Sequence, residues 1–212
     1  YTDRKNRVVE VNVAAKSKRT VLQNPESEFF GVQYSRDGKW ITYTKPASND
    51  MSVVYVCNLD SGKEYPVTEK WYDSSSPVFS SDGKYLIFNS SRTLRPTYSS
   101  VEWDYAYNRM GGVYMALLTK DTKSPLLPTD EIVTVTEDNK DVAEAKPTTA
   151  KKDKKAVDTK ADAPKTKPAV TVKIDTDGLC DRIIKIPVSN GDARNFYCDG
   201  KKLWFLGMSG TK

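Results

Sequence analysis

Short runs of alternating apolar and polar residues recur along the chain, and a tight-turn sequence precedes the clearest of them. The runs Trp40–Lys45 and Tyr85–Phe88 both follow the pattern Ser-x-Asp-Gly-Lys, at an offset of 45 residues. Period-2 alternation predicts a strand, and Asp and Gly favour the turn before it. Asp199-Gly200-Lys201 begins a third copy. A hairpin that returns after about 45 residues is typical of β-propeller blades.

The first hairpin belongs to a complete predicted blade in residues 29–68. Its four antiparallel strands are expected at Gly31–Ser35, Trp40–Lys45, Val53–Leu59 and Glu64–Thr68. The proline in the last run indicates an outer edge strand, where a missing N–H is tolerated. Residues 7–13 and 20–22 repeat the pattern of the last two strands, and they predict the end of an incomplete first blade.

A second predicted blade begins near Pro77, but an insertion at 91–112 delays its third strand, Val113–Leu118. The insertion is rich in aromatic residues and contains arginines, which is typical of an ordered functional or packing loop. One hypothesis is that its aromatic side chains cover the core of a neighbouring blade. The other is that it faces a ligand at one mouth of the propeller.

The ligand hypothesis assigns peptide contact to side chains of the insertion. A guanidinium group binds a carboxylate with two parallel hydrogen bonds, and aromatic rings supply apolar contact beside it. The candidate substrate-binding residues are Arg92, Arg95, Tyr98, Trp103 and Tyr105. The alternative for the two arginines is a solvated side chain or pairing with Glu102 and Asp104.

The predicted fold is all-β, a partial β-propeller of about three four-stranded antiparallel blades with a disordered insertion. Residues 137–169 consist largely of Lys, Ala, Asp, Thr and Pro, which cannot bury enough apolar surface to order the chain. The expected division is 1–136 for the first blades, 137–169 for a disordered linker, and 170–212 for a further, incomplete blade. A cut-out of a propeller leaves exposed edges, so we expect a larger ring or pairing with another copy.

Composition excludes several kinds of site. The chain contains no histidine, so it cannot by itself build a Ser-His-Asp triad, a Cys-His pair or a His-containing metal site. Its three cysteines are far apart and are expected to be buried small hydrophobic residues. No catalytic residue, metal or cofactor is predicted.

Charge and hydropathy argue against two kinds of partner, nucleic acid and a membrane. The net charge of +5 is spread too diffusely to indicate nucleic-acid binding, and there is no apolar run of 18 residues to span a membrane. The sequence begins inside predicted structure and without Met, so we expect a piece of a longer protein.

The ordered set of segments resembles the β-propeller region of bacterial tricorn-protease homologues. The segments that carry this resemblance are Asp73–Arg92, Pro96–Ser99, Val113-Tyr114, Leu118–Leu126, Ile174–Ile183 and Ile186-Pro187-Val188. In the fifth of them the chain keeps the frame Ile-Asp-x-x-Gly-x-x-x-Arg-Ile that the family typically shows. The Asp-Gly-Lys hairpin alone is shared by many propellers, whereas the ordered combination is much more specific.

The resemblance implies the propeller region of a large serine peptidase that degrades oligopeptides. The remaining propeller, a PDZ-like module and a peptidase domain are the implied partners, together with peptide substrates and further copies of the chain. The family's catalytic motifs match no position here, so the chain alone is expected to be non-catalytic. The implied role is to filter or guide peptides, or to act as a scaffold between domains, in the cytoplasm.

Other hypotheses stay open at this point. A stand-alone TolB-like propeller that mediates protein–protein contact would share the hairpin but not the insertion at 91–112 or the segment Ile174–Arg182. The propeller of a prolyl-oligopeptidase-like enzyme would require an α/β-hydrolase domain downstream. A signal peptide on the parent protein would make it periplasmic or exported.

Overall fold

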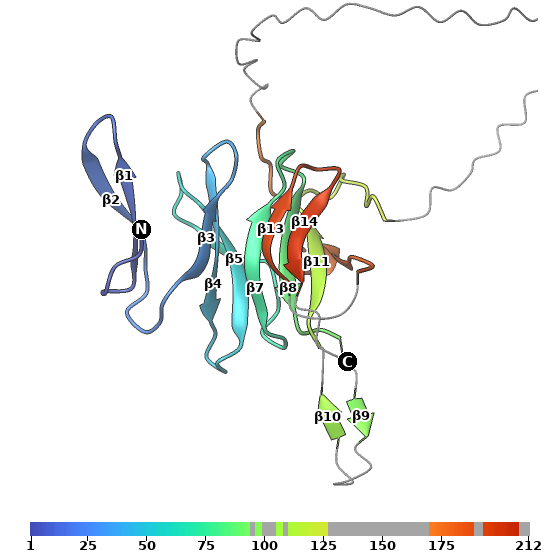
Figure 1. Cartoon of the computed structure of the whole chain (residues 1–212). Helices are drawn as coiled ribbons and strands as arrows, with labels where there is room; N and C mark the ends of the chain where they lie inside the picture. The colour runs from blue at the N-terminus through green and yellow to red at the C-terminus, as the bar shows by residue number, and fades with distance from the viewer. Residues whose placement is uncertain (94–95, 99–104, 108–109, 127–169, 189–192, 208–212) are drawn as a thin grey trace, which may run out of the picture. The chain divides into compact units, whose positions relative to one another are not determined.

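A computed structural model describes residues 1–93, 96–98, 105–107, 110–126, 170–188 and 193–207. Antiparallel strands dominate these ranges, which confirms the predicted all-β, partial propeller (Figure 1). The predicted disordered tract 137–169 lies outside the described residues. In the described ranges no helix has the length and apolar character needed to cross a membrane.

The first four-stranded sheet has the strand order β3-β4-β5-β6. Its strands are β3 (Phe30–Tyr34), β4 (Trp40–Pro46), β5 (Ser52–Asn58) and β6 (Glu64–Pro66), close to the predicted bounds. Ser35 Oγ donates to Asp37 Oδ1 (2.6 Å), and the N–H of Trp40 donates to Ser35 Oγ (2.9 Å). Gly38 has φ +69°, so the turn is formed by the predicted side-chain and glycine chemistry.

The second four-stranded sheet has the order β12-β11-β8-β7. Its strands are β7 (Ser74–Phe79), β8 (Tyr85–Ser90), β11 (Gly112–Leu117) and β12 (Ile183–Lys185). The turn between β7 and β8 repeats the first one, because Ser80 Oγ donates to Asp82 Oδ1 (2.6 Å) and accepts from the N–H of Tyr85 (3.0 Å).

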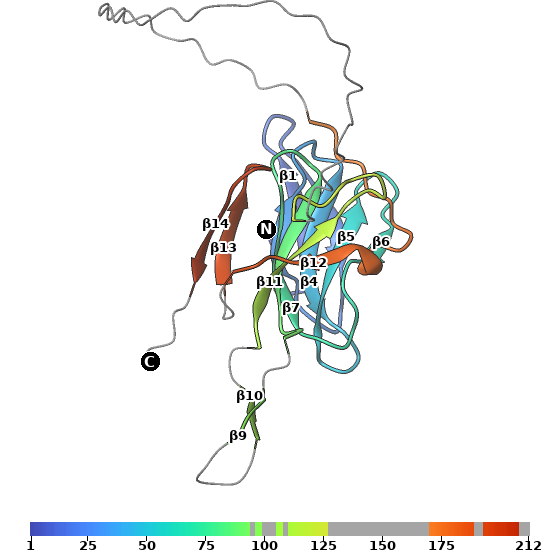
Figure 2. The same cartoon turned by 90° about the vertical axis from the view of Figure 1, so that its right-hand side faces the viewer.

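The fourth strand of this blade comes from a distant part of the chain. We predicted residues 170–212 as one further blade, but β12 lies beside β11 (Figure 2) and pairs with it in a register that sets Met115 opposite Ile184. The 3₁₀ helix η1 (Cys180–Arg182) leads directly into it. Residues 170–212 therefore contribute to two sheets.

Shorter hairpins complete the described structure. β1 (Arg7–Asn12) pairs with β2 (Ser17–Gln23), and β13 (Ala193–Cys198) pairs with β14 (Leu203–Gly207) around the third Asp-Gly turn. Inside the insertion, β9 (Pro96–Tyr98) pairs with β10 (Tyr105–Tyr107).

Apolar side chains fill the spaces between successive sheets. The two four-stranded sheets share a cluster of buried side chains. It includes Trp40, Val54, Val56, Val67, Phe79, Leu86, Phe88, Tyr114, Ala116 and Leu118. Ile41, Tyr43 and Cys57 on the other face of the first sheet pack with Val8 and Leu22 of the β1–β2 hairpin. Burying each large side chain contributes about 1.5–3 kcal/mol, so sheet-on-sheet packing is the main stabilising contact. Cys57 and Cys198 are buried, as predicted, whereas Cys180 is half-buried.

The first strand of each blade has a bulge at an equivalent position. Register shifts occur in β3, β7 and β13, and the residues Gly31, Ser76 and Asn195 within them have φ of 61°, 56° and 54°. These strands are sheet edges, and β7 contacts both β3 and β13. A Cβ on Gly31 would lie 3.3 Å from Pro77 Cδ, so the bulged edges approach closely.

Candidate functional site

Backbone hydrogen bonds hold Arg92 at the base of the aromatic insertion. It follows the end of β8, where the N–H of Ser91 donates to the carbonyl oxygen of Asp73 (2.9 Å). On its other side, the N–H of Thr93 donates to the carbonyl oxygen of Met110 (3.2 Å), which closes the two arms of the insertion. The backbone on both sides of Arg92 is therefore tied to neighbouring segments.

The guanidinium group of Arg92 lies against two tyrosine rings. Its central carbon is 5.6 Å from the ring centroid of Tyr72 and 6.0 Å from that of Tyr114. Tyr114 is buried in the cluster between the two complete blades, and Tyr72 belongs to the loop that joins those blades. Contact with the ring faces compensates part of the cost of removing the cation from water.

Two of the hydrogen-bond donor atoms of this guanidinium lack an acceptor. Within the described part of the chain, the buried Nε and Nη2 atoms of Arg92 have no hydrogen-bond partner. An ionised group buried without an acceptor is costly, and such a group in a native structure calls for an explanation, for instance a bound ion. The arrangement favours an anion as the missing partner.

A polar network borders the arginine on the side of β11 and β12. Thr93 Oγ1 is 3.1 Å from the hydroxyl of Tyr114 and accepts a hydrogen bond from Lys185 Nζ (3.0 Å). The network links Lys185 in β12, through Thr93 at the base of the insertion, to Tyr114 in β11.

The neighbouring thiol is not prepared for nucleophilic chemistry. Burial is the largest influence on Cys180 and raises its pKa, and the carboxylates of Glu69 and Asp181 raise it further, while Arg92 acts in the opposite direction. A thiol with a raised pKa stays protonated near neutral pH, and the thiolate is the reactive form. Among the described residues, no group of three or more His, Cys, Asp or Glu side chains is placed to hold a metal ion.

The structure describes only part of the predicted peptide-binding set. Tyr98 in β9 is opposite Tyr105 in β10, and Tyr98 is 52% exposed. Arg95 and Trp103 lie outside the described residues, as do the alternative arginine partners Glu102 and Asp104.

Sequence reasoning missed the aromatic neighbours of Arg92. Tyr72 and the preceding Trp71 lie in the short loop between the blades, and Trp71 is 79% exposed. Large exposed aromatic residues are enriched at binding surfaces. The signal that was available is the dipeptide Trp71-Tyr72 within an otherwise polar run.

Comparison with known proteins gives a consistent result. The family described as "Tricorn protease second beta propeller domain" matches residues 1–210. Tricorn protease homolog 1 of Streptomyces coelicolor is 26% identical over 122 residues, which are 58% of this chain and 11% of that protein. A putative tricorn-like protease C-terminal subunit of Sulfurisphaera tokodaii is 32% identical over 94 residues, 44% of this chain and 11% of that protein.

A solved structure shows the same fold. The crystal structure of the tricorn protease superposes on 91% of this chain with a TM-score of 0.62 and 16% sequence identity. The superposed region is 16% of that protein's chain. The chain thus spans only a small fraction of the length of the proteins that it matches.

Proposed function

The chain belongs to the family of tricorn protease second β-propeller domains, and on this premise we propose that it is a non-catalytic propeller sector of a larger serine peptidase. In this proposal the peptidase degrades oligopeptides in the cytoplasm, and the sector takes part in the access of peptides to a catalytic domain elsewhere. The partners are the remaining propeller blades, a PDZ-like module, the peptidase domain and further copies of the chain.

The observation that carries the access role is the set of bulged edge strands. In a propeller, the first strands of successive blades surround the axis, and β3, β7 and β13 are neighbouring sheet edges. A regular open edge would capture an extended peptide as an added strand. The bulges at Gly31, Ser76 and Asn195 interrupt each edge, and Pro77 lacks an N–H. Such edges suit a passage through which peptides move.

The absence of histidine from the sequence supports a separate catalytic domain. Peptide contact is proposed for the base of the insertion, through Arg92 and Tyr98, with Arg95, Trp103 and Tyr105 as further candidates. A parent protein without a PDZ-like module and a serine-containing peptidase domain would contradict this proposal and favour a stand-alone TolB-like propeller.

The access role is tested in the full-length parent peptidase by narrowing the proposed passage along the propeller axis. Gln33→Trp adds bulk to an exposed position of β3, and Lys18→Trp on the exposed part of β2 is the matched control. We expect kcat/KM for peptides of about ten residues to fall roughly tenfold, with hydrolysis of a tripeptide unchanged, because only the longer substrate is obstructed. If both substrates respond equally, or neither responds, the propeller is a scaffold rather than an access route.

A further inference from the structure

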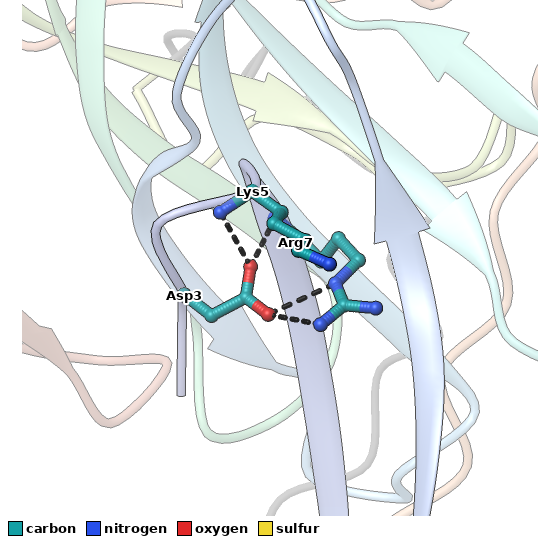
Figure 3. A network of polar contacts seen from close by, with 3 residues as sticks. All are labelled: Asp3, Lys5 and Arg7. Atoms are coloured by element: carbon teal, nitrogen blue, oxygen red, sulfur yellow. Dashed lines mark hydrogen bonds and ion pairs between the residues drawn. The ribbon is translucent and has the colours of Figure 1, made fainter.

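In three other arginines of this chain, atoms of the guanidinium edge formed by Nε and Nη2 donate hydrogen bonds to oxygen atoms. In Arg7, both atoms donate to Asp3 Oδ2, at 2.9 and 2.5 Å (Figure 3). Arg19 Nε donates to Glu10, and the Arg182 guanidinium donates to three backbone carbonyl oxygens. Arg92 is the contrasting case, since the same edge is buried and unpaired in the described structure.

The chemistry of that edge specifies its ligand. Nε–H and Nη2–H point in parallel and match the two oxygens of a carboxylate, which is the geometry that makes these pairs strong. None of the ion pairs among the described residues involves Arg92. Glu69 and Asp181, whose carboxylates act on Cys180, are thus not ion-pair partners of Arg92 in the described structure.

The two rings against the guanidinium differ in their freedom to move. Tyr114 is 7% exposed and stacks on Phe88 within the core between the blades, so it is a fixed wall. Tyr72 is 40% exposed and lies in the loop between the blades, so it is the less constrained of the two rings. Of the two rings, Tyr72 is therefore the one whose displacement would open a path to the buried edge.

We propose that the Nε/Nη2 edge of Arg92 is a receptor for a peptide carboxylate, covered by Tyr72 when empty. The residue that carries the carboxylate contacts the exposed Trp71, which gives the site a preference for a large apolar neighbour. The inference rests on the proposed function in that its ligand is a peptide. The carboxylate comes either from the peptide's C-terminus or from an acidic side chain.

Calorimetric titration of the full chain with matched peptides tests the site. The probes are an octapeptide ending in Leu with a free carboxylate, the same peptide as its C-terminal amide, and an amide peptide with an internal Glu. We expect the free acid to bind about tenfold or more tightly than the amide, because a charge-assisted bidentate pair is lost in the amide. Binding of the internal-Glu peptide as tightly as the free acid would assign the site to acidic side chains instead.

Variants separate a receptor from a structural cation. Arg92→Gln should abolish the difference between acid and amide, Arg92→Lys should reduce it, and Arg194→Gln at an exposed position should leave it unchanged. If the Arg92 variants fail to fold, Tyr72→Ala tests the same proposal. Removal of the Tyr72 ring should accelerate association of the free-acid peptide. Slower or unchanged association in Tyr72→Ala overturns the covered receptor.

The outcomes of this test and of the access test are independent. Equal binding of acid and amide, with Arg92→Gln lowering only the free energy of unfolding, makes Arg92 a structural cation between two rings and overturns the inference. Peptide access through the axis would then still stand on the Gln33→Trp result. Conversely, a carboxylate preference that depends on Arg92 supports the receptor even where Gln33→Trp leaves hydrolysis unchanged.

Discussion

The two complete blades have the same strand order but a very different continuity of chain. The first, β3-β4-β5-β6, lies within residues 30–66 and is joined by short turns. The second, β7-β8-β11-β12, spreads over residues 74–185, with long segments before and after β11. Both form a sheet with apolar faces toward their neighbours. The comparison shows that the pattern of strands defines a blade. A blade interrupted by long segments needs additional contacts to place its last strand.

These contacts lie around the segment 172–182, which leads back into the second blade and is called the returning segment below. The N–H of Asp175 donates to the carbonyl oxygen of Leu118 (2.8 Å), and the N–H of Lys120 donates to Asp175 Oδ2 (2.8 Å). Arg182 then donates to the carbonyl oxygens of Leu117 (3.0 Å), Asp177 (2.8 Å) and Asp175. Closing residues 118–182 rather than a five-residue turn costs about 2 kcal/mol in chain entropy, which these bonds offset.

The largest effect is expected from removing Arg182, which makes three of the hydrogen bonds around the returning segment. Arg182→Ala should lower the free energy of unfolding by about 3 kcal/mol, because hydrogen bonds from a charged donor are lost and half-buried carbonyl groups lose their partner. Urea denaturation measures the change. Arg194→Ala, which truncates an exposed arginine on β13, is the control and should change stability by less than about 0.5 kcal/mol.

The opposite outcome would alter the comparison between the blades. If Arg182→Ala costs no more than the control, then pairing of β12 with β11 and the packing of Ile183 suffice to hold the last strand. The interrupted blade would then need no more than the pattern that specifies the continuous one.

A second expected effect comes from the equivalent turn glycines, Gly38 and Gly83. Both have positive φ, 69° and 71°, but a Cβ on Gly38 would meet nothing within 4 Å, whereas on Gly83 it would lie 2.8 Å from Val172 Cγ2. Both substitutions to Ala should cost about 1 kcal/mol for the left-handed backbone. Gly83→Ala should cost about 1–2 kcal/mol more, because the returning segment packs against it.

Thermal unfolding of the two alanine variants measures this difference. Deleting the nearest methyl group in Gly83→Ala/Val172→Ala should bring the turn penalty closer to that of Gly38→Ala, after subtraction of the cost of Val172→Ala alone, with Val170 Cγ1 at 3.1 Å as the remaining obstruction. Equal losses in the two single glycine variants would show that the returning segment yields easily at this turn.

Local sequence signals predicted most of the fold, and long-range pairing accounts for what they missed. The Ser-x-Asp-Gly turns and alternating strands depend on neighbouring residues, so β3–β6 were predicted nearly to the residue. The place of β12 depends on pairing with β11 across a long insertion, for which no local signal exists. The left-handed Ser76 and Asn195 were also missed, because serine does not indicate positive φ, and asparagine, although enriched at positive φ, adopts negative φ in most of its occurrences.

The candidate site shows the same division. Arg92 was predicted because a guanidinium in an aromatic insertion is a local signal. Its partners Tyr72 and Tyr114 come from an inter-blade loop and from β11, and only the packing of the two blades brings them together. A side chain without a hydrogen-bond partner is likewise a property of the fold, so sequence alone left a solvated arginine, or one paired with nearby acids, as an open alternative.

The smallest expected effect is electrostatic and distinguishes the two turn aspartates. Asp37 Oδ2 accepts a hydrogen bond from the N–H of Val172 (2.8 Å), while Asp37 and Asp82 share equivalent bonds from Ser35 and Ser80. At pH 7, Asp37→Asn should therefore destabilise the chain by about 1 kcal/mol more than Asp82→Asn, because it loses a charge-assisted bond to the returning segment.

The pH dependence of stability gives the sign of this contribution. Burial acts to raise the pKa of Asp37, but hydrogen bonds from Ser35 and from the N–H groups of Val172 and Lys39 outweigh it, so the pKa is lowered from its ordinary 3.8. The stability that this carboxylate supplies is present above pH 3.8 and is lost as the pH falls through the lowered value. Urea denaturation between pH 6 and 2.5 should therefore show a steeper acid loss in the wild type than in Asp37→Asn. Parallel curves would mean that the bond to Val172 does not depend on the charge, and that the two turns differ in packing alone.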